Sequence, residues 1–557
     1  MPSITAKKIK GNTYYYARQS QRINGKPKIV WQKYLGRAED IIAAKDAAPA
    51  PKEVLVSEFG ASAALVDFAK QLKLVEIIDH HVPKRSQSVS VGSYMLIAII
   101  NRCLQPCSKN ALANWYASTV LPRLLGVEST KLTAQRFWDN MDRISIDALR
   151  TIERDIVAHM VQHFKVDVSQ LLFDATNFFT FIDSFNDKAE LAQRGHSKEG
   201  RKSLRIVGLA LLAAADHHVP ILHHTYPGNQ PDSPTFRSLV DALVARFHEL
   251  GEQHDSDVTL VFDKGNNCED NIAAVHDSPY HMIGSLVPTH HPDLLAVPAR
   301  QFKPLDELPG VSTWRTTKVL YGTEYTVVVA KNQNLEQTQT ATLLREIAKR
   351  RQKLHEIQWQ LRRWQTGQIT KGRRPRVAGT QKKVDECLKA RHMNELFDVC
   401  VELTEHGVPK LTYRFERQAW KHLQRTLLGK HLIFTDRAEW SDAQIVRGYR
   451  AQHHVERAFR DLKDTQHIAI RPQYHWTDQK IQVHVLICVL ALMLQTLLYR
   501  YLGSQGQTLS CHQILDELAG IKEVGVVYPA NRKGASPKMQ MTLSSLSEIQ
   551  QTLYKSL

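Results

Sequence analysis

The sequence predicts an α/β protein in which a domain with a central sheet is interrupted by an insertion and preceded by a β-hairpin and a helical region. Three observations predict this. Strand-like and helix-like segments alternate between residues 168 and 288, a succession typical of a mixed α/β domain. Apolar residues at 57–165 recur at three- and four-residue spacing, which indicates helices. From about 291 the texture changes to strands and a long basic helix, and helical sequence resumes at 441.

The N-terminal segment, residues 1–50, predicts a β-hairpin followed by a linker. TYYYARQSQRINGKPKIVWQKYLG (13–36) has two strand-like runs joined at Asn24-Gly25, a dipeptide favoured in tight hairpin turns. AAKDAAPAPKE (43–53) is of low complexity and is expected to be a linker.

The remaining boundaries follow the changes of texture. Five strands are expected at LLFDATNFFTFI, IVGLALLAAAD, PILHHTYPG, VTLVFDKG and HMIGSLV, with a helix at SPTFRSLVDALVARFHEL (233–250). We expect a helical domain at 51–165, the first part of the sheet domain at 166–290, an insertion at 291–440, the second part of the sheet domain at 441–503 and a C-terminal tail at 504–557.

The charge of the chain favours a polyanionic partner. Its 557 residues include 73 Lys and Arg against 56 Asp and Glu, a net charge of +17, which suits nucleic acid first and an anionic membrane surface second. Residues 345–383 hold 13 Lys and Arg and two acids, a net charge of +11. An ordinary solvated face is the alternative for this basic stretch.

The cysteines and apolar segments exclude other classes. Seven scattered cysteines show no disulfide framework and no zinc-ligand spacing, so we expect reduced thiols in a cytosolic protein. The N-terminus lacks the apolar core of a signal peptide. The uncharged stretch 481–499 is nearly long enough to span a bilayer, but we expect a helix buried inside a large domain.

Two carboxylates lie in apolar, strand-like sequence. Asp174 interrupts QLLFDATNFFTF (170–181) and Asp263 ends the apolar run of LVFDKGNN. A buried, unpaired carboxylate is costly. If the two strands are adjacent, both side chains can share a divalent cation such as Mg²⁺. Taken alone, each aspartate is better explained as a strand-end or turn residue.

A third carboxylate follows on a predicted helix, SDAQIVRGYRAQHHVERAFRDLK (441–463). Ser441 and Gln444 have the spacing of a capping box. Tyr449, Glu456 and Lys463 are seven residues apart and lie on one stripe, with Gln452 near its edge. Taken alone, this stripe is explained as a solvated Glu/Lys face.

Together, these motifs resemble bacterial insertion-sequence transposases of the DDE class. One subgroup carries the signature Y-x-x-R-x-x-x-E-x(6)-K, which Tyr449, Glu456 and Lys463 match, while Gln452 stands where the signature has Arg. The first two acidic strands, HTYPGNQPDS and RPQYHWTDQKIQVHVLICVLALML resemble further family segments in the same order. The likeness covers roughly 166–290 and 430–500.

The resemblance implies a ribonuclease-H-like catalytic core with a β-rich and helical insertion. Asp174, Asp263 and Glu456 would bind two Mg²⁺ ions, for which Mn²⁺ can substitute, and the enzyme would cut transposon ends and join them to target DNA by two-metal phosphoryl transfer. The residues expected to contact DNA are Tyr449, Arg450 (in place of the missing Arg at 452), Gln452, Lys463, Arg362, Arg363, Arg373 and Arg374.

The resemblance also implies partners and a location. Double-stranded DNA, as terminal inverted repeats and as target, is the expected partner, with a homodimer in the active synaptic complex and no membrane. The expected location is the bacterial cytoplasm, in association with the nucleoid. Domain order alone assigns recognition of the ends to 51–165.

Two other functions stay open at this point. A metal-dependent DNA nuclease of the same fold needs the same three acids but does not join strands. A catalytically inactive, DNA-binding descendant would not cut at all. The three intact acids argue against the inactive descendant, while Gln452 keeps it open.

Overall fold

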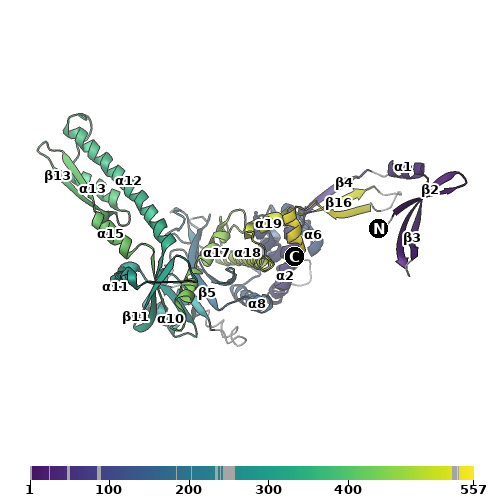
Figure 1. The fold of residues 1–557 in the computed structure, drawn as a ribbon, viewed down its shortest axis with the longest axis horizontal. Coiled ribbons are helices and arrows are strands. Elements are labelled where there is room, and N and C mark those ends of the chain that lie inside the picture. The colour runs from purple at the N-terminus through teal and green to yellow at the C-terminus, as the bar shows by residue number, and fades with distance from the viewer. Residues whose placement is uncertain are drawn as a thin grey trace. The chain divides into compact units, whose positions relative to one another are not determined.

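A large mixed sheet organises the main part of the protein (Figure 1). The computed structural model describes residues 3–23, 26–46, 50–83, 89–183, 185–201, 203–231, 236–238, 240–241, 257–529, 536 and 538–557. Among these residues the sheet has nine strands in the order β10-β11-β12-β15-β9-β8-β5-β6-β7. The strands are β5 (Gln170–Phe179), β6 (Ile206–Ala214), β7 (Pro220–Pro227), β8 (Thr259–Val261), β9 (His281–Ser285), β10 (Lys303–Pro304), β11 (Val311–Leu320), β12 (Thr323–Asn332) and β15 (Lys430–Thr435). The mixed α/β class is confirmed.

The five strands β5 to β9 lie where the apolar sequence predicts them. β5, β6 and β7 form an antiparallel meander, and β8 and β9 run parallel to β5. Every residue of β6 and β8 is buried, which explains why these strands are continuous apolar runs rather than alternating ones. The helix expected at 233–250 lies largely outside the described residues. The described part of this segment, 236–238 and 240–241, is helical.

The segment expected to be an insertion, 291–440, is divided by the structure. β10, β11, β12 and β15 pair in order onto β9 and extend the large sheet. The residues between β12 and β15 form a separate arm, residues 333–428. Its elements are α12 (Gln333–Gln365), α13 (Val377–Leu388), α14 (Met393–Leu396), β13 (Phe397–Leu403), β14 (Pro409–Phe415) and α15 (Arg417–Thr426).

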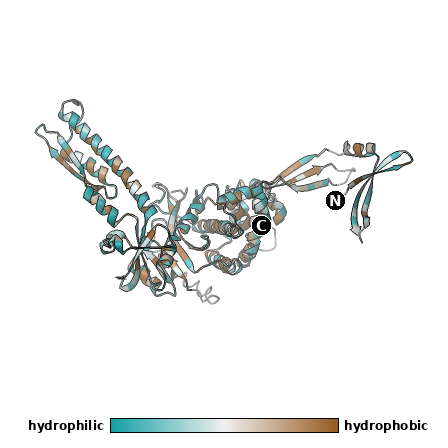
Figure 2. Cartoon of the chain, viewed as in Figure 1, coloured by the Kyte–Doolittle hydropathy of each residue, from teal (hydrophilic) through white to brown (hydrophobic). Residues whose placement is uncertain are grey.

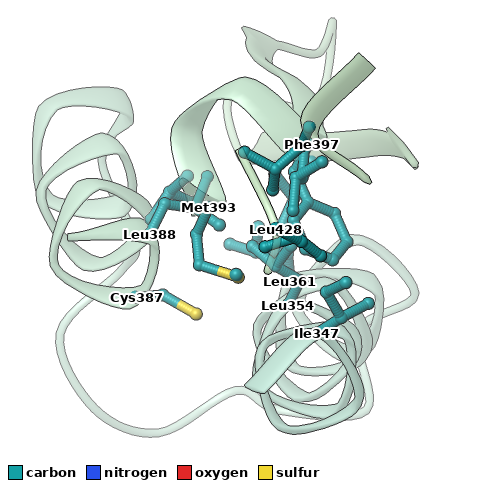
Figure 3. Close-up of a cluster of buried hydrophobic side chains, with 12 residues drawn as sticks. Ile347, Leu354, Leu361, Cys387, Leu388, Met393, Phe397 and Leu428 are labelled. Atoms are coloured by element: carbon teal, nitrogen blue, oxygen red, sulfur yellow. The ribbon is translucent and has the colours of Figure 1, made fainter. Parts of the chain in front are cut away.

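The arm has a hydrophobic core of its own. Ile347, Leu354 and Leu361 of α12 recur every seven residues, so they face one side of the helix. They pack against side chains of α13, α14 and β13. Figure 3 shows the labelled side chains of these elements gathered in one cluster. The rest of α12 is mostly hydrophilic in Figure 2, as expected for a helix with one buried stripe.

Helices pack around the remaining strands of the sheet. α18 (Asp478–Ser504) contacts α4, α7, α8 and β7. It is the one helix of the described residues that is long and apolar enough to cross a membrane, and 94% of its most apolar window is buried inside the structure. The expected burial of 481–499 is confirmed. Other helices of this part are α3 (Leu74–His81), α4 (Val91–Leu104), α7 (Ala134–Asp142), α8 (Ile146–Phe164), α10 (Glu269–His276), α11 (Pro292–Leu295), α16 (Asp442–Arg450) and α17 (His453–Lys463).

The chain divides into two compact units, and the large sheet and the arm belong to the unit of Ala64–Ala113 and Val127–His512. The other unit contains Met1–Ala63, Asn114–Gly126 and Gln513–Leu557. Its elements are β1 (Ser3–Ile9), β2 (Asn12–Ile23), β3 (Lys26–Gly36), α1 (Ala38–Asp46), β4 (Glu53–Glu58), α6 (Leu121–Leu125), β16 (Lys522–Tyr528), β17 (Lys538–Leu543) and α20 (Glu548–Ser556). Three further helices contain a division between the units, namely α2 (Gly60–Gln71), α5 (Leu112–Ala117) and α19 (Cys511–Ala519).

This second unit contains more strands than the sequence predicts. β1 adds a third strand to the expected hairpin, whose turn at Asn24-Gly25 lies outside the described residues. The start of the expected linker is helical in α1. β16 pairs with both β17 and β4, so the segment 504–557 contributes two strands to a sheet with a strand from the expected helical domain.

The arm is expected to lose stability when its core is truncated. Leu354 is fully buried and Leu344, on the same helix, is 50% exposed. Leu354→Ala should lower the free energy of unfolding of the arm by about 2–5 kcal/mol because it removes buried methyl groups and leaves a cavity. Leu344→Ala is the matched control and should change it by less than about 0.5 kcal/mol. Hydrogen exchange of the α12 amides measures both, and an equal loss in the two variants would contradict the assignment of this core.

Candidate active site

The strands that carry the first two acids are neighbours in the sheet. β5 and β8 run parallel, with Leu171 paired to Leu260 and Leu172 to Val261. Asp174 lies two residues beyond the second pair on its strand, and Asp263 lies two residues beyond it on the other. Both therefore stand at the same level and on the same face, on chains about 4.8 Å apart. The sequence expectation of adjacent strands is met.

The third acid, Glu456, lies on α17, and the sequence did not predict where this helix begins. The single helix expected at 441–463 is wrong, because the structure has α16 and α17 separated at residues 451–452. Here the Gln452 N–H donates to the Tyr449 carbonyl at 3.2 Å and the His454 N–H to the Ala451 carbonyl at 2.8 Å, so the backbone tightens to i→i−3 bonds. The capping box of Ser441 and Gln444 is present.

A tertiary contact accounts for the break. The Gln452 side-chain amide donates to the carbonyl of Phe173 on β5 at 2.9 Å, and α17 packs on β5 and β6. No local pattern reports a bond between residues 279 positions apart. The break leaves Tyr449 at the end of α16 and Glu456 in the first turn of α17.

One pocket of about 360 Å³ brings the three acids together. Its lining comes from β5, Asp263 two residues after β8, β12, β15, α16, α17 and the turn between the two helices. Six of the predicted site residues line it, and five residues that the sequence analysis did not single out complete it. The lining residues are Asp174, Asp263, Glu456, Tyr449, Arg450 and Gln452, with Ala330, Asn332, His431, Ile433 and Val446.

The electrostatics of Asp174 show that the acids interact. The pKa of Asp174 is raised from its ordinary 3.8 to about 6, mainly by burial and to a smaller extent by the charges of Asp263 and Glu456. A hydrogen bond from the Ala175 N–H, at 2.8 Å, and the charge of Lys198 act in the opposite direction. The ionised form of Asp174 is therefore disfavoured mainly by its burial, and the two other acids add to this effect.

Asp263 and Tyr449 both form a hydrogen bond with Ser285 of the neighbouring strand β9. The Ser285 hydroxyl on β9 donates to Asp263 Oδ1 at 3.2 Å and its hydrogen bond with Tyr449 lowers the pKa of that phenol. Burial, Asp263 and Glu456 together raise the Tyr449 pKa instead, so the phenol stays protonated and keeps an O–H donor at neutral pH.

The cationic side of the pocket is supplied by Arg450. Burial lowers the pKa of its guanidinium. The pKa of His431 is lowered mainly by burial, and the positive charges of Arg450 and Lys264 lower it further. The Oε1 atom of Gln452 is buried and has no hydrogen-bond partner. A pocket with one arginine, a phenol and an unpaired amide oxygen beside three carboxylates suits a polar, phosphate-bearing ligand together with a cation.

Five predicted residues lie away from the pocket. The ammonium of Lys463 donates to Thr176 Oγ1 at 2.7 Å and lies 3.5 Å from Glu199, which also pairs with Arg471. Burial lowers the Lys463 pKa. The other four are on the arm, at the end of α12 (Arg362 and Arg363) and in the loop before α13 (Arg373 and Arg374).

The three carboxylates have the chemistry of ligands for a divalent cation. Carboxylate oxygens are the ligands that Mg²⁺ prefers, and a cation would relieve the charge that raises the Asp174 pKa. Among the described residues, no three His, Cys, Asp or Glu side chains lie close enough together to hold one metal ion. The residues therefore fit Mg²⁺ in chemical type, and closer approach of the side chains is needed to enclose it.

Several residues of the site carry no signal in the sequence. Lys198 follows Asp174 by 24 positions in a loop, Ser285 ends β9, and His431 lies in the apolar strand β15. His431 stands between Lys430 and the apolar run Leu432–Phe434 and does not interrupt that run as Asp174 does in its strand. Lys198 and Ser285 are found only once the strands are placed side by side.

Comparisons with known proteins give little beyond this geometry. No protein-family model matches the chain, and no curated protein sequence matches it. Among solved structures, it is similar to a cryo-EM structure of the piggyBac transposase synaptic complex with hairpin DNA, with 8% sequence identity, a TM-score of 0.35 and coverage of 82% of this chain and 79% of that chain. A likeness at this level decides neither fold nor activity.

The raised pKa of Asp174 predicts a pH-dependent stability in metal-free buffer. Between pH 3.8 and about 6 the folded protein binds more protons at this site than the unfolded chain, so stability falls as pH rises through this window. The loss should approach about 2–3 kcal/mol above pH 6. Asp174→Asn removes this titration and should raise the thermal midpoint relative to wild type at pH 7.5 but not at pH 4.

A matched control is Asp306→Asn, which changes an exposed aspartate and should leave the pH dependence of the wild type in place. If the thermal midpoints of Asp174→Asn and Asp306→Asn depend on pH in the same way, the pKa of Asp174 is not raised as described above.

Proposed function

We propose that this protein is a DNA transposase that cuts transposon ends and joins them to target DNA. The observation that carries the proposal is the convergence of Asp174, Asp263 and Glu456 on one pocket. These acids come from three distant segments and belong to the motifs that resemble the DDE class. The basic chain, with a net charge of +17, supports DNA as the partner. The adjacent strands β5 and β8 and the helix α17 support a ribonuclease-H-like core.

The chemistry proposed for the pocket is in-line phosphoryl transfer. Asp174, Asp263 and Glu456 would hold the Mg²⁺ or Mn²⁺ ions, which supply Lewis-acid activation of the attacking oxygen and stabilise the leaving oxygen. The protein's own contribution is positioning and electrostatics. Ser285 orients Asp263 through their hydrogen bond. Tyr449 would donate to a phosphate oxygen, and Arg450 would neutralise its charge.

Gln452 stands at the position of the arginine in the family signature, and Arg450 would make the phosphate contact expected of that arginine. Gln452 uses its amide to hold β5 through the Phe173 carbonyl, so it positions the strand that carries Asp174. Arg450, two residues earlier, lines the same pocket and would make the phosphate contact. Lys463 would have to leave Thr176 and Glu199 to reach a phosphate.

The wider assembly is proposed on charge and chemistry. Arg362, Arg363, Arg373 and Arg374 on the arm would contact the DNA backbone. Two ends must meet for joining, which requires at least a homodimer in the active complex, and we place the protein in the bacterial cytoplasm, in association with the nucleoid. A metal-dependent nuclease and an inactive DNA-binding descendant remain distinct outcomes of the first experiment below.

Cleavage of DNA carrying the element's own ends tests the function. Wild type with Mg²⁺ should nick the ends and join them to a second duplex, and EDTA should stop both. Glu456→Gln keeps the size of the side chain but removes the charge, and it should lower the rate by roughly 100-fold or more, since such a charge supplies several kcal/mol in the transition state. Glu76→Gln, on the exposed face of α3, is the matched control and should keep the wild-type rate.

Each product pattern has a consequence. Nicking without joining by wild type would identify a nuclease instead. Binding of the ends without cutting, under Mg²⁺ and under Mn²⁺, would identify an inactive descendant. Equal activity of wild type and Glu456→Gln would remove Glu456 from the site.

A second prediction separates Arg450 from its neighbour Arg447. Arg450→Gln should lower the end-cleavage rate by roughly tenfold or more because a charge-assisted phosphate contact is lost. Arg447 lies on the same helix, pairs with Glu307 at 2.6 Å and does not line the pocket. Arg447→Gln should therefore cleave at close to the wild-type rate, and the reverse order of the two variants would refute the assignment of Arg450.

A further inference from the structure

The N-terminal three-stranded sheet belongs to a segment that is basic throughout. Residues 1–37 contain nine Lys and Arg and no Asp or Glu. The first acids, Glu39 and Asp40, lie in α1, where Asp40 accepts a hydrogen bond from the Arg37 N–H at 2.8 Å. We infer that this sheet, residues 3–36, is a docking surface for the backbone of double-stranded DNA, separate from the candidate active site and from the expected end-binding domain 51–165.

The sheet lacks a core that would explain its stability. None of its described side chains from residue 3 to 35 is buried. Ile4 is 66% exposed, Ile29 51% and Trp31 47%. A sheet of this size needs a hydrophobic face packed against something, and exposed apolar residues grouped on one element mark an interaction site. The helix α1 contacts β2 and β3, but these exposed apolar side chains remain open to a partner.

The strand register distributes positive charge over both faces. Lys7 is opposite Tyr14, and Arg18 lies on the same face of β2 as Tyr14. On the other face Lys8 is opposite Thr13, Lys33 is opposite Ala17 and Lys28 is opposite Gln21. All four lysines are exposed. A surface for an anionic membrane would separate an apolar face from a basic one, whereas exposed apolar and basic residues here alternate on both faces.

Aromatic rings stiffen one of these faces. The ring centroids of Tyr16 and Tyr34 are 5.3 Å apart, and those of Tyr14 and Tyr34 are 6.1 Å apart. The Arg37 guanidinium lies 5.6 Å from the Tyr14 centroid. This cluster fixes the cross-strand packing of β2 and β3 and leaves tyrosine hydroxyls to donate to phosphate oxygens.

The first hairpin has the shape and charge for a groove of DNA. Its turn is Lys10-Gly11, with φ values of 47° and 82°, the left-handed pair that lets two strands turn tightly with their natural twist. Lys7, Lys8 and Lys10 surround this tip. A two-stranded ribbon fits the major groove of B-DNA, about 12 Å wide, and lysines on its two faces then reach the phosphates on both sides.

Binding of the full-length protein to DNA in EDTA tests the inference. The probe is a labelled random-sequence duplex of about 30 base pairs, followed by fluorescence anisotropy from about 50 to 200 mM salt. The sheet variant combines Lys7→Gln, Lys8→Gln and Lys33→Gln. Loss of about three phosphate contacts should reduce the slope of log affinity against log salt by about 2 to 3 and weaken binding by about tenfold or more.

The matched control changes three exposed cations of the expected end-binding domain, Lys70→Gln, Lys73→Gln and Arg143→Gln. It removes the same charge and should keep a larger part of the wild-type affinity and slope. An unchanged slope in the sheet variant, or an equal loss in the control, would overturn the inference. So would tighter binding to the single strand, to duplex RNA or to vesicles with about 30% phosphatidylserine than to duplex DNA.

Because the measurement is made without metal, it is independent of cleavage. Failure of the proposed function would show as intact binding of the probe without cutting of the ends, so the two failures are distinguishable. Trp31→Ala, which removes an exposed side chain from the same sheet, provides a second variant. It should weaken binding without changing the salt slope, and far-UV circular dichroism of each variant confirms that the sheet is retained.

Discussion

The parallel pairing of β5 with β8 is the constraint on which the candidate site depends. It brings Asp174 and Asp263 from 89 positions apart in the chain to adjacent places on one face of the sheet. β8 is only three residues long, and all three are buried, so its register is held by burial on both faces. Once β5 is in place, α17 packs on it and Glu456 reaches the same pocket.

This arrangement concentrates negative charge where the protein can neutralise only part of it. A backbone N–H and Lys198 oppose the increase in the Asp174 pKa, but burial and two neighbouring carboxylates outweigh them. Such strain is common at functional sites, where local stability is lower than the fold would otherwise permit. Ser285 and Gln452 each tie a site element to a strand of the sheet through a hydrogen bond.

Positive charge is concentrated outside the pocket. The stretch 345–383 has a net charge of +11, and residues 1–37 contain nine basic residues and no acid. The two stretches are supported differently: the arm has its own hydrophobic core, whereas the N-terminal sheet has none. The two basic stretches therefore lie on elements that differ in internal packing.

The sequence by itself determined the mixed α/β class, the five strands from β5 to β9 and three acids with the residues beside them. Apolar runs are local patterns and predict these strands, whereas the seven-residue stripe of Tyr449, Glu456 and Lys463 is interrupted by the break between α16 and α17. The break at 451–452, the roles of Lys198 and Ser285, and the place of β10 to β12 and β15 in the large sheet were decided only by the tertiary structure. Each depends on a contact between residues far apart in the chain, such as the Gln452 amide on the Phe173 carbonyl, and no pattern within one segment contains that information.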